Sequence, residues 1–235
     1  MPRHAQVNNI DHRDLKVDTR RSAALGDDVG FAATFPAEFR DLQACYPIVF
    51  RKDARGSLSP VALLGFEEGR NLFLDGERWD AHYLPLAIER QPFLIGRSGD
   101  ELTVHIDLDH PRVGRTDGEP LFREHGGNTE YLDRIASVLL TLHNGLDRVP
   151  AFVDALLALD LLESFAFDVE LDDGSQNRLA GYYTINEERL RSLDAEALGR
   201  LHAAGYLEPV FMAVASISNF RGLIDRMNRN RAGGR

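Results

Sequence analysis

The chain has 235 residues, of which 43% are hydrophobic and 27% charged, and its formal net charge is −10. This composition is typical of a globular protein and excludes a disordered chain, while the acidic balance repels phosphate and disfavours nucleic-acid binding. The single cysteine, Cys45, cannot form an internal disulfide, and no apolar run approaches the roughly 20 residues of a membrane span.

The N-terminal residues contain no apolar stretch of the kind found in secretory signals. We therefore expect a cytoplasmic protein with no membrane span.

The first half of the chain favours short strands. Residues 34–42 predict a short helix, because Pro36 has the backbone angle of a first helical turn. The runs 46–50, 60–66 and 71–75 are separated by tight polar turns and predict an antiparallel meander. Apolar and polar residues alternate over 102–108, which indicates a half-buried strand.

The second half favours helices, with one hairpin inserted. Apolar residues at spacings of three and four predict a helix from Asn128 or Thr129 that Gly145 ends, and Pro150 begins another. The runs 164–171 and 178–185 flank an Asp-Gly turn, which is a strong hairpin signal. Further helices are expected after Asp194, as far as Gly205, and from Pro209.

These elements predict an α+β fold that forms a single compact domain over residues 1–235. Its small antiparallel sheet would consist of the meander and the later hairpin, packed by helices of the C-terminal half. The strand-rich part covers residues 1–110, and the helix-rich part covers residues 128–230.

The sequence lacks the glycine-rich phosphate-binding loops, the hydrolase Gly-x-Ser-x-Gly motif and paired Cys-x-x-Cys ligands. One metal-like fragment is His105-Ile106-Asp107, whose His and Asp share a strand face and resemble part of an iron facial triad. His143 and His202 are the candidate third ligands by residue type. Because polar residues on the outer face of a strand need no function, we assign no metal site, no catalytic residue and no cofactor.

Aromatic residues gather in one stretch of the chain around Arg90. They either form a core with the arginine at its rim, or line a groove for a ligand or peptide. The surface most suited to a ligand or partner comprises Trp79, Tyr83, Arg90 and Phe93.

A set of ordered segments spans nearly the whole chain: residues 46–50, 62–66, 69–74, 79, 83–85, 90–93, 118–122, 181–182 and 216–220. In these segments the chain resembles the SapC-like family of bacterial proteins. The family is linked to bacterial surface layers. Its members are similar to proteins encoded beside TonB-dependent receptors, halogenase-like proteins and cupin or JmjC-like oxygenases. No catalytic residues belong to its pattern.

The resemblance and the absence of catalytic motifs together predict a non-enzymatic accessory protein. It would bind partner proteins in a bacterial surface, uptake or peptide-modification system, and halogenase-like or cupin/JmjC-like proteins are the partners that the family suggests. The alternatives are an enzyme of the non-haem iron oxygenase type that uses His105 and Asp107, and a surface-layer-associated structural protein.

Overall fold

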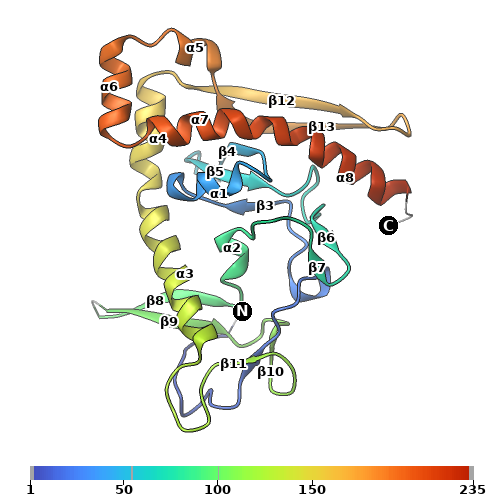
Figure 1. Cartoon of the computed structure of the whole chain (residues 1–235), viewed down its shortest axis with the longest axis vertical. Helices are drawn as coiled ribbons and strands as arrows, with labels where there is room; N and C mark the ends of the chain where they lie inside the picture. Colours follow the sequence, from blue (N-terminus) through green and yellow to red (C-terminus); the bar gives the residue numbers. More distant parts are fainter. Residues whose placement is uncertain (1–2, 54, 100, 233–235) are drawn as a thin grey trace. The chain divides into compact units, whose positions relative to one another are not determined.

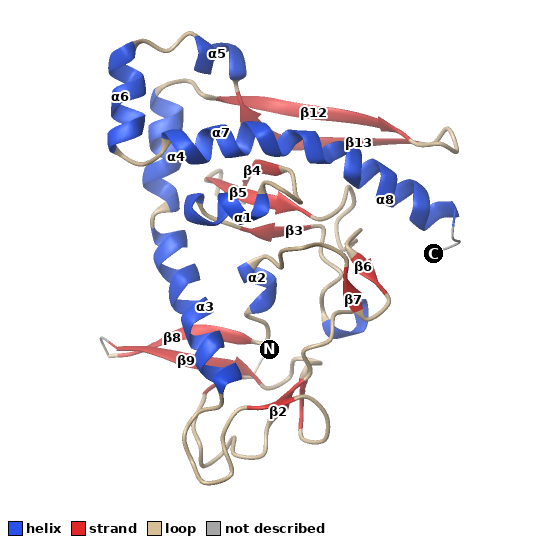
Figure 2. Cartoon of the chain, in the orientation of Figure 1, coloured by secondary structure: helices blue, strands red, loops and turns tan. Residues whose placement is uncertain are grey.

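The computed structural model describes residues 3–53, 55–99 and 101–232 (Figure 1). The chain divides into two compact units. The first unit comprises residues 1–28, 74–80 and 86–144, and the second comprises residues 29–73, 81–85 and 145–235. Both contain helices and antiparallel strands, so the predicted α+β class is confirmed (Figure 2).

The first unit contains short strands and one long helix. Its strands form three antiparallel sheets, ordered β1-β9-β8, β10-β2-β11 and β6-β7. The bounds are β1 (His4–Gln6), β2 (Lys16–Val17), a 3-10 turn η1 (Ala23–Leu25), β6 (Leu74–Asp75), β7 (Arg78–Trp79), α2 (Leu86–Glu89), β8 (Phe93–Ser98), β9 (Glu101–Asp107), β10 (Val113–Gly114), β11 (Glu119–Pro120) and α3 (Glu130–Asp147).

The core of this unit is built from the alternating strand and the amphipathic helix. Ile106 of β9 and Phe93 of β8 are opposite each other in the register, and both are fully buried. They belong to one apolar cluster with Leu132, Ile135 and Leu139, which recur on one face of α3. The sequence periodicity of two for β9 and of three to four for α3 therefore predicted both elements.

A buried ion pair fixes the loop that precedes the second unit in sequence. The Arg112 Nη2 donates to Asp27 Oδ2 at 2.5 Å, and the two side chains are 1% and 0% exposed. The same guanidinium donates to the carbonyl oxygens of Asp18 and Arg20, at 2.8 and 2.5 Å. Arg112 therefore holds together both ends of a loop that has little apolar burial of its own.

The second unit contains a five-stranded antiparallel sheet in the order β12-β13-β4-β5-β3, with helices packed against it (Figure 1). The bounds are β3 (Phe31–Ala33), η2 (Pro36–Glu38), α1 (Phe39–Leu42), β4 (Ile48–Lys52), β5 (Leu58–Leu63), α4 (Val149–Ala158), β12 (Leu162–Glu170), β13 (Gln176–Ile185), α5 (Glu187–Arg191), α6 (Ala195–Ala203), α7 (Leu207–Ser216), η3 (Ile217–Asn219) and α8 (Phe220–Ala232).

The predicted meander is present for its first two strands, β4 and β5, but its third run lies elsewhere. Residues 71–73 are not a strand, because the Asn71 side chain accepts the Phe73 N–H in a local turn. Leu74 and Asp75 pair with β7 instead. The far edge of β5 pairs with β3, which the sequence analysis did not predict.

Helices of the C-terminal half pack on this sheet, as predicted. The Phe152 ring of α4 lies 6.3 Å from that of Phe50 on β4 and 6.0 Å from that of Phe39 on α1. On α7, the fully buried Ser216 hydroxyl accepts the Ile48 N–H at 2.9 Å. The small polar residue therefore joins α7 to β4 by a hydrogen bond.

The prediction that Gly145 ends its helix is wrong, because α3 continues to Asp147. A Cβ atom at Gly145 would lie 2.5 Å from Cγ of Phe35, a side chain that is only 2% exposed. The glycine is therefore required for close packing against a ring, whereas the sequence suggested a helix end.

Candidate functional site

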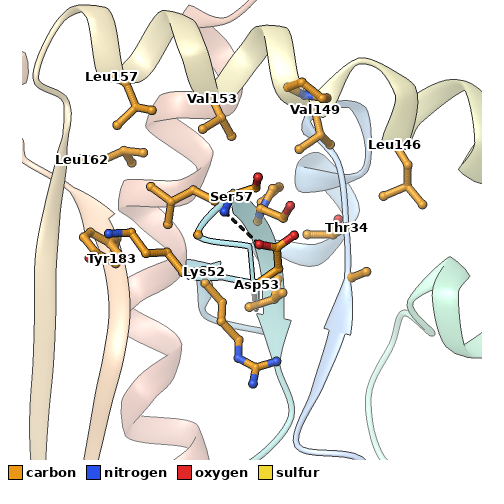
Figure 3. A pocket seen from close by; sticks show the side chains of 18 of the residues that line it. Thr34, Lys52, Asp53, Ser57, Leu146, Val149, Val153, Leu157, Leu162 and Tyr183 are labelled. Atoms are coloured by element: carbon orange, nitrogen blue, oxygen red, sulfur yellow. Dashed lines mark hydrogen bonds between the residues drawn. The ribbon is translucent and has the colours of Figure 1, made fainter.

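A groove of about 780 Å³ lies in the second unit between α4 and the strands β3, β4 and β5 (Figure 3). We call it the α4 groove. Helical side chains form one wall, the β4–β5 hairpin forms the other, and Leu162 and Tyr183 lie at one end. Its volume falls within the range of sites that hold drug-sized ligands or short peptide segments.

The helical wall is apolar because α4 has almost no polar face. Its sequence, Val-Pro-Ala-Phe-Val-Asp-Ala-Leu-Leu-Ala, contains one polar residue, Asp154. A helix that is apolar on every side is normally buried on every side. Phe152 and Leu156 are fully buried, but Leu157 is 47% exposed, and Leu146, at the end of α3, is 40% exposed. Both exposed leucines line the groove.

The strand wall is fixed by the turn between β4 and β5. The Asp53 Oδ1 accepts the N–H groups of Arg55 and Ser57, both at 2.8 Å. Gly56 adopts a φ of 83°, which a side chain disfavours. The carboxylate therefore organises the turn from within, as the dashed bond to Ser57 shows (Figure 3).

Two cations lie where β4 ends. The Lys52 Nζ is 4.8 Å from the centroid of the Tyr183 ring, and the Arg51 Cζ is 4.6 Å from that of Phe31. Both separations are within the range of cation–π attraction, which limits the motion of these long side chains. Lys52 is directed to Tyr183 and places a positive charge at that end of the groove (Figure 3), whereas Arg51 lies over Phe31 on β3. Asp53 and Asp154 also line the groove.

A buried carboxylate connects the groove to Tyr83, one of the four predicted binding residues. Thr34 lines the groove, and its hydroxyl donates to Glu38 Oε2 at 2.6 Å. The Tyr83 hydroxyl donates to the other oxygen of Glu38 at 3.2 Å, and the Tyr83 carbonyl accepts the Tyr46 hydroxyl. Tyr83 is therefore linked to the groove indirectly, because the buried Glu38 carboxylate, 2% exposed, accepts both its hydroxyl and that of Thr34.

The other three predicted residues belong to the first unit. Phe93 is fully buried in the core of this unit, so its role in a binding surface would be to pack under the residues that contact the partner. The Arg90 Nη1 donates to the Phe93 carbonyl at 2.7 Å, and burial lowers the pKa of this guanidinium. Trp79 is half-buried on β7, opposite Leu74. The structure thus brings Arg90 and Phe93 together, and the binding role of the four residues stays a prediction.

His105 and Asp107 are engaged locally on β9. The His105 ring packs over Gly96, and its Nε2 lies 3.1 Å from the Thr103 hydroxyl. The Asp107 carboxylate accepts the Asp109 N–H at 3.1 Å. Among the residues that the structure describes, no three His, Cys, Asp or Glu side chains are grouped so that they could hold a metal.

The sequence patterns did not predict the α4 groove. The available signal was the surplus of apolar residues in 149–158, which exceeds what one buried helix face requires. Periodicity alone could not tell which of these residues remain uncovered.

The fold is thus α+β, and its second unit presents an open, largely apolar groove with Lys52 at one end. A family model described as SapC matches residues 7–223, so the chain belongs to the SapC family. No curated protein and no solved structure matches the chain. Within the described part of the chain, the helices are too short or too polar to cross a bilayer.

Proposed function

We propose that the protein is a non-enzymatic accessory protein that binds an extended apolar segment of a partner protein in the α4 groove. The observation that carries the proposal is the pair of leucines, Leu146 and Leu157, that stay 40% and 47% exposed beside a groove. Covering the exposed part of each contributes about 1 kcal/mol. The two together favour an occupied groove by roughly 30-fold in affinity.

The shape of the groove supports a peptide segment as the occupant. From Val149 to Leu157 the helix rises about 12 Å, which is the length of about four residues in an extended chain. The Lys52 cation at the Tyr183 end of the groove complements an acidic residue at the end of such a segment. The preferred partner segment is therefore apolar in its middle and acidic at one end.

The SapC family supplies the proposed setting. The partner would belong to a bacterial surface, uptake or peptide-modification system, and halogenase-like or cupin/JmjC-like proteins are the candidates. The proposal places the protein in the cytoplasm, where its partner is met before any assembly at the surface.

A substitution at Leu157 tests the proposal, with Leu140 as the matched control. Leu140 is 48% exposed but lies on α3 in the other unit, outside the groove. Random dodecapeptides displayed on phage are selected on the wild-type protein, and the enriched peptides are synthesised. We expect them to be apolar with an acidic end, to bind Leu157→Asp at least tenfold more weakly, and to bind Leu140→Asp as they bind the wild type.

Three outcomes would contradict the proposal. The first is that the enriched peptides bind Leu157→Asp as tightly as the wild type, while circular dichroism shows both to be folded. The second is that no peptide is enriched over selection on an unrelated acidic protein. The third is that pull-down recovers no partner while the purified protein turns over a substrate.

A further inference from the structure

The strand β12 forms the outer edge of the five-stranded sheet (Figure 1). It runs for nine residues, Leu162–Glu170, and pairs with β13 on one side. On its other side no strand in the described part of the chain is paired with it. The hairpin also projects, because β13 pairs with β4 only through Tyr182 and Tyr183. A long free edge offers a row of backbone donors and acceptors for a further strand.

The edge is held in shape from one face. Phe165 and Phe167 lie 5.3 and 4.9 Å from the Phe220 ring, measured between centroids. The alternate residues Ser164 and Ala166 face the other way and are exposed. β12 is therefore ordered before any partner arrives, which reduces the entropy cost of adding a strand to it.

The charge along this edge is strongly acidic. Glu163, Asp168 and Glu170 are exposed on β12, and Asp172 follows in the turn, beside Asp173, which is paired with Arg231 of α8 at 3.1 Å. Arg178 is the one basic residue in the hairpin, and it lies 3.7 Å from Asp168 with both side chains exposed. A second copy of β12 would bring these carboxylates together, so the edge resists pairing with itself and favours a basic strand.

A hollow beside the start of β12 matches a basic side chain in shape as well as charge. It measures about 410 Å³, with Phe165, Val214 and Ile217 among its apolar lining. Glu163 and Glu188 also line it. A lysine or arginine buries its aliphatic stem against apolar residues and keeps its charged end at a polar rim.

We infer that the free edge of β12 binds an extended, basic segment of a partner polypeptide by strand addition. One lysine or arginine of that segment enters the hollow beside Glu163. This surface adjoins the α4 groove at Leu162, the first residue of β12, but it does not depend on the function proposed for the groove.

The probe is a blocked heptapeptide of alternating lysine and valine, tested on the full chain. Two matched peptides separate charge from strand pairing: the same sequence with N-methylated valines, and a sequence with glutamate for lysine. We expect the lysine peptide to bind and to protect amides of β12 from hydrogen exchange. The N-methylated peptide, which keeps the charge but lacks alternate N–H donors, should bind at least tenfold more weakly, and the glutamate peptide should not bind.

The matched variants are Glu163→Gln at the hollow and Glu130→Gln, an exposed carboxylate at the start of α3. Glu163→Gln should weaken binding of the lysine peptide about threefold to tenfold, whereas Glu130→Gln should leave the affinity for this peptide unchanged. Equal binding of the N-methylated peptide, protection outside β12, or no binding of the lysine peptide would overturn the inference. Protection of β12 in a dimer without peptide would overturn it too, because the occupant would then be a second copy. The Leu157→Asp variant is expected to bind the lysine peptide with wild-type affinity, since Leu157 lies in the α4 groove and the peptide pairs with β12.

Discussion

Two glycines within helices are predicted to respond in opposite ways to replacement by alanine. Gly199 lies exposed in α6, and a Cβ there would meet no atom within 4 Å. Gly145 lies in α3, and a Cβ there would fall 2.5 Å from Cγ of the buried Phe35 ring. Helix propensity is the same in both cases, so only the tertiary contact separates the two variants.

The magnitudes follow from this difference. Gly199→Ala should raise the free energy of unfolding by about 0.5–1 kcal/mol, because alanine loses less backbone entropy in a helix. Gly145→Ala gains the same term but forces the Phe35 ring into a packed core, at a cost of about 1–3 kcal/mol. The net effect is a loss of up to about 2 kcal/mol, and because the helix term is common to both variants, they should differ by the packing cost of about 1–3 kcal/mol.

Urea denaturation followed by circular dichroism measures both changes as shifts of the midpoint at constant slope. A double-mutant cycle assigns the cause: in a Phe35→Leu background the smaller side chain leaves room, so Gly145→Ala should cost less than in the wild type. If Gly145→Ala stabilises the protein as Gly199→Ala does, or if its effect is the same in the Phe35→Leu background, the packing argument is wrong.

Two further predictions concern the first unit. Asp27→Asn should lower the free energy of unfolding by about 3–5 kcal/mol, because it leaves the Arg112 charge buried without its carboxylate partner. The control is Arg78→Met, in a pair with Asp75 whose side chains are 72% and 59% exposed, and it should cost less than about 1 kcal/mol. Equal losses of the two variants in urea denaturation would contradict this prediction. His110 has a pKa below its usual value of 6.5, first because of burial and then because of the nearby Arg112 charge, and its Nδ1 accepts the Arg112 N–H at 3.3 Å. The unfolded chain therefore takes up this proton at higher pH than the folded protein does, so the stability that neutral His110 provides is complete above pH 6.5 and is lost as the pH falls below it. His110→Asn should remove that part of the pH dependence, and parallel stability curves for variant and wild type from pH 8 to pH 5 would refute it.

The sequence by itself determined those features that depend on neighbouring residues. The apolar spacing in 130–142 is enough to form α3, since the side chains that lie on one helix face are close in sequence. The Asp-Gly turn fixed the β12–β13 hairpin, and Asp194 caps α6 by accepting the Ala197 N–H at 2.8 Å. The segments that resemble the SapC family were likewise readable from the chain, and the family match over 7–223 confirms them.

Only the tertiary structure decided which elements meet. The strand beside β5 is β3, about thirty residues earlier, because a strand's neighbour is chosen by complementary packing over the whole unit. The same holds for Gly145 against Phe35, for Arg112 against Asp27 and for the α4 groove. An apolar residue has the same local preference whether its neighbours cover it or not, so the exposure of Leu146 and Leu157 could not be predicted from the spacing of residues.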